Sequence, residues 1–498
     1  MLSHLTPAVI LGIIAAYFLV LIVVSYFTGR NASNEDFFLA GRKSPWPLVA
    51  IGMIGASLSG VTFISIPGVV GAGGENQAFA YMQMVFGYLI GYLVIAHVLM
   101  PMYYKERLTS IYEFLNKRFG FEAYKTGAGY FLLSRTIGAA FRLYLVAIVL
   151  QQFVLGPFGV PFFVTVAVTI LLIWIYTFRG GINTIIWTDG LQTVAMLTAV
   201  VLTIVAIGNA LETDLGGMVS MIRSSEYSQM FFFAGGWNDP NNFFKMVISG
   251  ALITIVMTGL DQDMMQKNLS CPNIRDAQKN MYLFSFILVF ANLLFLSLGA
   301  LLYLYAASIG LEIPARTDQL YPAIALNHLP VAVGIFFVIG LIAAAYSSAD
   351  SALTALTTSF CVDFLGFEQD ERPEAEKQRT RLYVHIGFSV LLLVIIVVFN
   401  ALNNKDVISQ LFKAAGYTYG PLLGLFTFGL FTRRVVAMRW VIPVCIAAPI
   451  LSYVINANSA DWLYGFQFGF LIIALNGLLT FAGLWLISKE AAPAPEAV

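Results

Sequence analysis

Apolar stretches recur along the chain at the length that a helix needs to cross a lipid bilayer, about 20 residues at a rise of 1.5 Å per residue. Short polar segments separate them, the longest near 211–243. The pattern predicts an all-α integral membrane protein with about 13 transmembrane helices. These predicted spans are 8–28, 46–71, 78–102, 127–154, 160–178, 184–210, 244–265, 281–308, 331–362, 381–400, 407–431, 436–455 and 464–487.

Two of the predicted helices contain weak points in the middle. The second span, IGMIGASLSGVTFISIPGVVG, carries four glycines, four hydroxyl side chains and Pro67, and the seventh, VISGALITIVMTGLDQDMMQK, weakens at Thr258, Gly259 and Asp261. A helix break at membrane depth is tolerated only where the freed backbone groups face protein or a polar cavity. Two broken helices five spans apart are typical of a transporter built from two repeats, with its binding site at the breaks.

A repeat of five helices is an odd number, so the second copy must be inverted in the membrane. No segment has the length or composition of a separate soluble domain, which disfavours a receptor with an attached cytoplasmic module. The predicted division is an extra helix and loop over 1–45, a first repeat over 46–212, a second repeat over 213–435 with an outside loop at 213–243, and two final helices with a short tail over 436–498.

Composition and charge placement agree with this pattern. The chain is 59% hydrophobic and 11% charged, whereas a soluble domain carries about 25% charged residues. Lys and Arg gather in alternate loops, with Arg223, Arg316 and Lys405 the main exceptions, and the rule that cytoplasmic loops are basic places the N-terminus outside and the C-terminus in the cytoplasm, in the plasma (cytoplasmic) membrane. The basic loop residues are Arg30, Arg42, Lys43, Lys105, Arg107, Lys117, Arg118, Lys125, Arg179, Lys267, Arg275, Lys279, Arg372, Lys377, Arg379, Arg381, Arg433, Arg434, Arg439 and Lys489.

Several functional classes find no support in the sequence. The three cysteines, Cys271, Cys361 and Cys445, have neither metal-site spacing nor a disulfide framework. The chain shows no hydrolytic triad, phosphate loop or zinc motif, so we expect no enzyme. The expected partners are the lipid bilayer, a small solute and an ion, with no nucleic acid and no obligate protein partner.

The stretch AAAYSSADSALTAL gathers oxygen atoms on one helix face. Ser347, Asp350, Ser351 and Thr354 stand at i, i+3, i+4 and i+7, with Ala344 one turn earlier. Hydroxyl, carboxylate and carbonyl oxygens suit a cation such as sodium. The serines alone would equally suit close helix packing, but an acid within the membrane costs about 2.5–3.5 kcal/mol and marks a functional site.

Further charges lie within predicted spans. Asp189 stands in the sixth span beside Thr188; it is either a functional acid or one that reaches water near the cytoplasmic end. Arg135 and Arg142 lie two turns apart on the fourth span. They either neutralise Asp189, Asp350 or Asp261, or one of them faces the cavity and binds an anionic solute.

The motifs together resemble those of the sodium/solute symporter family, which includes sodium-coupled glucose, proline, iodide, monocarboxylate and sialic acid carriers. The resemblance runs from the first span to about the eleventh. It implies a five-plus-five inverted repeat with one helix before the core and two after it. The motifs are SLSGVTFISIPG, RLTSIYEFLNKRFG, YTFRGGINTIIWTDGLQ, DQDMMQKNLS, AAAYSSADSALTAL and GPLLGLFTFGLF.

The resemblance also implies roles for individual residues. The sodium site common to the family corresponds here to Gly55, Leu58, Ala344, Ser347 and Ser348, and the second site of two-sodium members corresponds to Asp189, Asp350 and Ser351. Where those members usually present a hydroxyl, this chain has Asp350, which either strengthens a cation site or carries a proton. An isolated buried carboxyl favours a proton, whereas a bound cation keeps it ionised.

Solute contacts are implied at both breaks and on two other helices. The SLSGVTFISIP run is most similar to that of the sialic acid carriers, in which an arginine binds the solute carboxylate; its position falls here at Gly138, one turn from Arg135 and from Arg142. A neutral sugar is the alternative solute. The implied solute-binding residues are Ser59, Thr62, Phe63, Gln83, Arg135, Arg142, Thr258, Asp261 and Gln262.

The expected function is sodium-coupled import of a small hydrophilic solute by alternating access, with one or two sodium ions per cycle. The solute would be a sugar, a sugar acid such as sialic acid, or a small carboxylate. The alternatives are proton coupling through Asp350 in the same fold, an uncoupled channel or facilitator, and a solute sensor.

Overall fold

The computed structural model describes residues 6–29, 34–74, 76–178, 181–367, 369–402 and 407–490. Its described residues are helical except for connecting segments and one small antiparallel sheet, in which β1 (Val435–Val436) pairs with β2 (Ser488–Lys489). Three of the charges used to predict the orientation, Arg30, Arg179 and Lys405, lie outside the described residues.

Each predicted span has a helical counterpart, but two of these counterparts are shorter than a membrane span. In the described part, nine helices are long and apolar enough to cross a membrane, or eleven if each of two bent pairs is one span. Two shorter apolar helices, Phe162–Thr177 and Gly420–Phe431, correspond to the other two predictions. The first half contains α1 (Pro7–Thr28), α2 (Asn34–Leu39), α3 (Trp46–Ser57), α4 (Ile66–Val69), α5 (Tyr81–Val94), α6 (Met100–Lys105), α7 (Glu113–Arg118), α8 (Phe121–Leu150), α9 (Phe162–Thr177) and α10 (Gly181–Ala210).

The second half follows with a short helix in the predicted outside loop and then the remaining spans. These helices are α11 (Leu215–Ser224), α12 (Phe243–Thr254), α13 (Gln262–Leu269), α14 (Ile274–Ser308), α15 (Leu320–Asn327), α16 (Val331–Ser359), α17 (Glu374–Leu402), α18 (Val407–Thr418), α19 (Gly420–Phe431), α20 (Val441–Ala457), α21 (Ser459–Trp462) and α22 (Ile472–Leu486).

Both predicted breaks are present. The first broken helix bends by 61° between α3 and the segment Val61–Val69, and the second bends by 64° between Phe243–Gly259 and α13. At the first bend Leu58 leaves the helical conformation, with φ −80° and ψ 70°. At the second, Asp261 is extended and its side chain caps α13 by accepting a hydrogen bond from the Asp263 backbone N–H.

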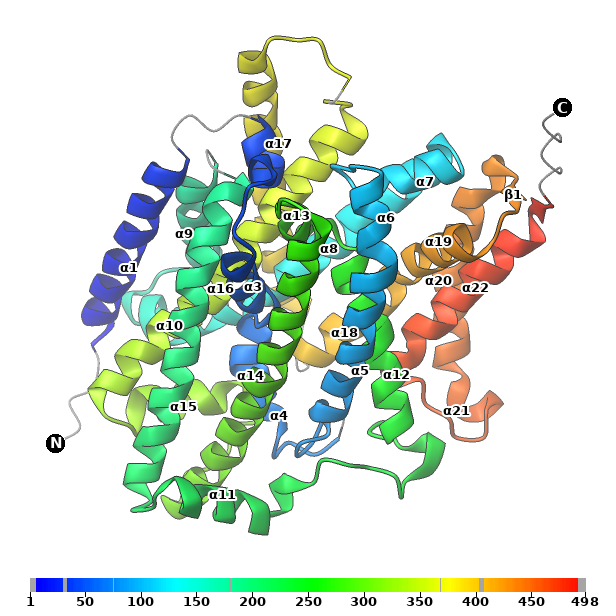
Figure 1. Cartoon of the computed structure of the whole chain (residues 1–498). Coiled ribbons are helices and arrows are strands. Elements are labelled where there is room, and N and C mark those ends of the chain that lie inside the picture. The colour runs from blue at the N-terminus through cyan, green and yellow to red at the C-terminus, as the bar shows by residue number, and fades with distance from the viewer. Residues whose placement is uncertain are drawn as a thin grey trace, which may run out of the picture.

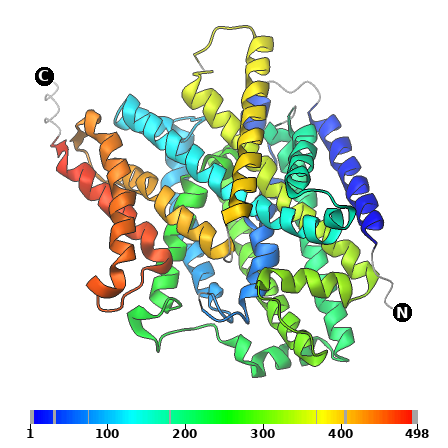
Figure 2. The same ribbon diagram turned by 180° about the vertical axis from the view of Figure 1, so that it is seen from behind.

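The broken helices lie in the interior of the bundle. Figures 1 and 2 show α1 at one edge of the molecule and α22 at the opposite edge, with the broken helices between them. Helix α10 packs against α16 and α3, and α5 packs against α12. Helix α11 lies at the end of the molecule opposite to the loop that joins α16 to α17 (Figure 1).

Glycines allow α5 and α12 to touch backbone to backbone. A Cβ added to Gly87 of α5 would lie 2.1 Å from the carbonyl oxygen of Val247, and one added to Gly250 of α12 would lie 2.1 Å from that of Met84. Small residues permit such contacts between membrane helices. The contact joins a helix of the predicted first repeat to a helix of the predicted second.

We expect Gly250→Ala to destabilise the protein by about 1–3 kcal/mol, because the added methyl group overpacks a contact made of backbone atoms. The melting temperature of the purified protein in detergent measures the effect. Gly129→Ala in α8 is the matched control, since a Cβ there meets no atom within 4 Å. Equal melting temperatures for the two variants would contradict the proposed contact.

Candidate ion and solute site

A cavity lies where the two broken helices face each other. Its volume is about 720 Å³, counted with the space at its open mouth. Residues of α5, α8, α14 and α18 complete the wall around the two breaks. Six of the residues predicted for ion or solute binding line it: Leu58, Ser59, Thr62, Arg135, Arg142 and Thr258.

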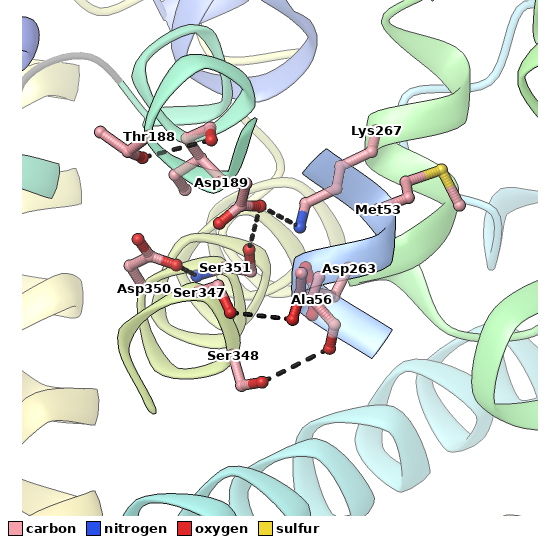
Figure 3. Close-up of polar contacts among 12 residues, drawn as sticks. Met53, Ala56, Thr188, Asp189, Asp263, Lys267, Ser347, Ser348, Asp350 and Ser351 are labelled. Atoms are coloured by element: carbon pink, nitrogen blue, oxygen red, sulfur yellow. Dashed lines mark hydrogen bonds and ion pairs between the residues drawn. The ribbon is translucent and has the colours of Figure 1, made fainter. Parts of the chain in front are cut away.

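Two serines of α16 reach the broken end of α3. The Ser347 hydroxyl donates to the Gly55 carbonyl oxygen at 2.9 Å, and the Ser348 hydroxyl donates to the Ala56 carbonyl oxygen at 3.4 Å (Figure 3). Both serines are fully buried, and Ala344 lies one turn earlier on the same buried helix. The structure therefore brings the Ser347 hydroxyl to the predicted Gly55 carbonyl, while the Ser348 hydroxyl meets the carbonyl of Ala56, which was not predicted.

The break explains why these carbonyl groups are available. The last carbonyls of a helix lack partners within the helix, and α3 ends at Ser57 in the middle of the bundle. Gly55 also lets α10 approach closely, because a Cβ there would lie 2.4 Å from the Thr193 hydroxyl oxygen. That hydroxyl donates to the carbonyl oxygens of Ile51 and Asp189, both at 2.8 Å.

Asp189 is paired with a lysine. The Lys267 ammonium donates to Asp189 Oδ2 at 2.6 Å, and the Ser351 hydroxyl donates to the same oxygen at 3.4 Å (Figure 3). The ion pair is buried, with the side chains of Lys267 and Asp189 exposed by 1% and 0%. Asp189 Oδ1 has no hydrogen-bond partner among the described residues.

The position of Lys267 corrects the sequence analysis, which counted it among the basic loop residues. Lys267 lies in α13 and is buried. The residues after 265 are mostly polar, so the hydropathy pattern placed the end of the predicted span at that residue. Because the chain bends at Asp261, the polar helix that follows stays inside the bundle.

Asp350 lies on the other side of α16. Its Oδ2 accepts a hydrogen bond from the Tyr176 hydroxyl at 2.7 Å, and its Oδ1 accepts one from the Ser351 backbone N–H at 2.5 Å. Figure 3 shows Asp350 on the side of α16 away from Lys267. No ion pair to Asp350 is present among the described residues, although its side chain is fully buried. Of the three residues predicted for the second sodium site, Asp189 and Ser351 are joined by a bond between their side chains, whereas Asp350 contacts Ser351 only at its backbone N–H.

Arg135 is neutralised by two acids at the second break. Its Nη2 bonds to Asp263 Oδ2, and its Nη1 lies 4.0 Å from Asp261 Oδ2. The Tyr419 hydroxyl donates to Asp261 Oδ2 at 2.5 Å. Asp263 was missed because it follows the apolar part of the span; its spacing of four from Lys267 could have indicated a shared face of one buried helix.

Arg142 has no such partner. Within the described residues it forms no ion pair, and its Nε has no hydrogen-bond acceptor. Its exposed fraction is only 9%, and it lines the cavity. Of the two arginines, Arg142 is therefore the one whose guanidinium is available to a ligand.

Four residues predicted for the solute do not line the cavity. Asp261 is taken up by the contacts with Arg135 and Tyr419. Phe63 packs in an aromatic cluster with Tyr321, its ring centroid 5.3 Å away.

The two glutamines among these four hold connecting segments in place. Gln83 donates to the Asn241 carbonyl oxygen at 2.8 Å and accepts from the Phe232 N–H at 3.0 Å. Gln262 accepts from the Ile111 N–H at 3.0 Å and donates to a loop carbonyl. In this structure the two amides bind connecting segments and lie outside the cavity lining, so their assignment to the solute stays a prediction.

Two broken helices, a hydroxyl stripe across the break and buried ionic groups around a cavity define a cation-coupled membrane transporter. The chain belongs to the Sodium:solute symporter family, whose family model matches residues 37–438. It is therefore a sodium-coupled solute symporter and not an enzyme. The matches give no support to the channel and sensor alternatives.

Named relatives agree with this assignment. The chain is 26% identical over 470 residues to the sodium/sialic acid symporter NanT of Aliivibrio fischeri, covering 91% of this chain and 89% of that protein. It is 24% identical over 500 residues to the sodium/sialic acid symporter SiaT of Proteus mirabilis, covering 97% and 96%. The solved substrate-bound, outward-open structure of a Na⁺-coupled sialic acid symporter has a TM-score of 0.81 at 19% identity, covering 97% of this chain and 99% of that one. The shared fold confirms the predicted inverted repeat.

We expect Arg135→Met to cost about 3–5 kcal/mol of stability, because it leaves two buried carboxylates without their cation. The measurement is the melting temperature in detergent. Arg142→Met is the control, since it makes the same substitution in the same helix at an arginine without an ion pair. A melting temperature of the Arg135 variant equal to that of the control would show that the ion pair contributes nothing to folding.

Proposed function

We propose that the protein imports a small carboxylated solute together with sodium. The observation that carries this proposal is the buried Arg142 guanidinium, which lines the cavity without a counter-ion in the described structure. A buried unpaired charge is costly, and a guanidinium fork matches a carboxylate with two parallel hydrogen bonds. A carboxylate that enters the cavity would supply the missing charge.

The other polar groups of the cavity suit a hydroxylated solute. Ser59 and Thr62 from the first break and Thr258 from the second present hydroxyls to the cavity, beside Tyr81 and Tyr88. The two named relatives are sodium/sialic acid symporters, and sialic acid combines one carboxylate with several hydroxyls. A sugar acid of this kind is therefore the first solute to test.

The first sodium ion is proposed to bind at the broken end of α3. Its ligands would be the carbonyl groups of Gly55, Leu58 and Ala344 and the hydroxyls of Ser347 and Ser348. The support is the contact of both serines with carbonyl oxygens of α3. Backbone carbonyls and hydroxyls are oxygen ligands of the kind that a hard monovalent cation requires.

The charge of the solute sets the driving force. A sodium ion crossing a potential of 100 mV releases about 2.3 kcal/mol, and a tenfold sodium gradient about 1.4 kcal/mol more. If the solute is a monovalent anion, the contributions of the membrane potential to the two opposite charges cancel. One sodium ion then supports roughly tenfold accumulation of the anion, and a second sodium ion at Asp189 and Ser351 would restore the contribution of the potential.

A proton carried in addition to sodium is the second proposal, favoured by Asp350. This acid is buried, accepts a hydrogen bond from Tyr176 and has no ion pair in the described structure. Uptake into proteoliposomes distinguishes the candidates. Uptake that follows a sodium gradient and persists when the proton gradient is collapsed supports sodium coupling alone.

The orientation is proposed from the basic loops. They place the N-terminus outside and the C-terminus in the cytoplasm of the plasma membrane. Solute and sodium would then enter the cavity from outside and leave it to the cytoplasm by alternating access.

We expect Arg142→Met to weaken binding of a carboxylated solute by about 10- to 150-fold, the equivalent of losing a charged hydrogen bond. Calorimetry of the purified protein with sialic acid, glucuronate and pyruvate, and with their neutral amides, measures this change. The wild type should prefer the acids to the amides, and the variant should lose that preference. A wild type that binds glucose or the amides as well as the acids would contradict the proposed carboxylate contact.

We expect Ser348→Ala to raise the sodium concentration for half-maximal stabilisation or uptake by roughly tenfold or more, because one oxygen ligand is lost from the ion. Ser389→Ala in α17 is the control. Its hydroxyl is also buried, but it bonds only within its own helix, to the carbonyl oxygen of His385 at 2.9 Å. Equal sodium dependence of the two variants would show that Ser348 is not a sodium ligand.

A further inference from the structure

Three helices meet at the position predicted for the second sodium ion. Asp189 comes from α10, Ser351 from α16 and Lys267 from α13. The Lys267 ammonium lies 2.6 Å from Asp189 Oδ2, and the Ser351 hydroxyl bonds to the same oxygen (Figure 3). The Asp189 carboxylate, expected to bind a sodium ion together with the Ser351 hydroxyl, thus already binds a cation of the chain itself, the Lys267 ammonium.

The ammonium provides what a sodium ion would provide at this place. Each is a single positive charge that a carboxylate and a hydroxyl can neutralise and solvate. With Lys267 in place, Asp189 is neutralised. A sodium ion at the same carboxylate would face a second positive charge at short range in a buried environment, where repulsion between like charges is strong.

The lysine is held there by its neighbours in α13. Gln266 donates to the Phe38 carbonyl oxygen at 2.5 Å and to the Thr358 hydroxyl of α16 at 2.9 Å. On the other side of Lys267, Asn268 accepts a hydrogen bond from the Asn280 amide of α14 at 2.7 Å. The backbone of α13 is therefore fixed on both sides of the lysine, and the 1% exposure of its side chain leaves no aqueous space into which the ammonium could withdraw.

We propose that the Lys267 ammonium is the resident occupant of the second cation site, so that the protein binds and couples one sodium ion per solute and not two. This inference deepens the proposed function and rests on its sodium coupling, but it does not depend on the identity of the solute. Lys267 is a stoichiometry-determining residue. For a carboxylated solute the cycle would be electroneutral.

The test counts sodium ions on the purified protein in the absence of solute. Saturation binding of ²²Na⁺ should give one ion per chain for the wild type. Lys267→Met keeps much of the side-chain length but removes the charge, and should raise the count to two because Asp189 is then free to bind sodium. Lys267→Arg retains a cation and should stay at one.

A double variant shows whether the second ion needs Asp189. Lys267→Met/Asp189→Asn removes both charges together, so it should regain thermal stability relative to Lys267→Met and return to one sodium ion. Two ions on the wild type, or one ion on a folded Lys267→Met variant, would overturn the proposal. The wild-type count requires no substitution, so two ions there overturn the proposal even if Lys267→Met fails to fold.

The outcome is separable from the proposed solute. A sodium count of two would not affect the predicted preference for acids over amides, which depends on Arg142, because the count is made without solute. Conversely, loss of that preference leaves the sodium count unaffected. Absence of any sodium binding to the wild type would contradict the sodium coupling itself together with the proposal.

Discussion

The structure depends on how it satisfies backbone groups that are freed in the middle of the membrane. Hydrocarbon offers no hydrogen bonds, so a helix can break there only if protein supplies partners. At the end of α3 the hydroxyls of Ser347 and Ser348 supply them, and at the start of α13 the carboxylate of Asp261 does so. The Ser347 and Ser348 hydroxyls that make the first break tolerable are also the ones proposed to bind sodium.

Most of the buried charged side chains near the two breaks form ion pairs. Arg135 is neutralised by Asp261 and Asp263, and Lys267 by Asp189. Within the described structure, Arg142 and Asp350 are left without an ion pair, one cation on the cavity wall and one anion beside Tyr176. The unpaired Arg142 is the group on which the proposed carboxylate contact rests, because a fully paired charge has little affinity left for a ligand.

The sequence predicted much of the fold and part of the site. Hydropathy located the spans, and clusters of glycine and hydroxyl residues located both breaks, because these signals are local. Helical spacing placed Ser347, Asp350, Ser351 and Thr354 on one face of α16, but Asp350 lies on the other side of the helix, beside Tyr176. Lys267 and Asp263 could not be recognised, because polar residues after a break look the same whether the chain leaves the membrane or turns back into the bundle.

Pairing and side-chain use were predicted only in part: Asp261 was among the three acids expected to neutralise an arginine, but Asp263 was not. The partner of Arg135 is set by the bend that brings α13 beside α8, and no spacing along the chain encodes that distance. Gln83 and Gln262 have the composition of ligand residues, but they bind loop backbone. A side-chain amide can form hydrogen bonds with a solute or with the backbone of a loop, and only the three-dimensional arrangement decides between the two.

The glycine contact between α5 and α12 has a mechanical consequence. Two backbones with no side chains between them cannot slide without colliding, since each carbonyl group lies in the space above the opposite glycine. We therefore expect the two helices to move together as one rigid body. Such a unit would contain one helix from each predicted repeat, and opening of the cavity would then occur at other helix interfaces.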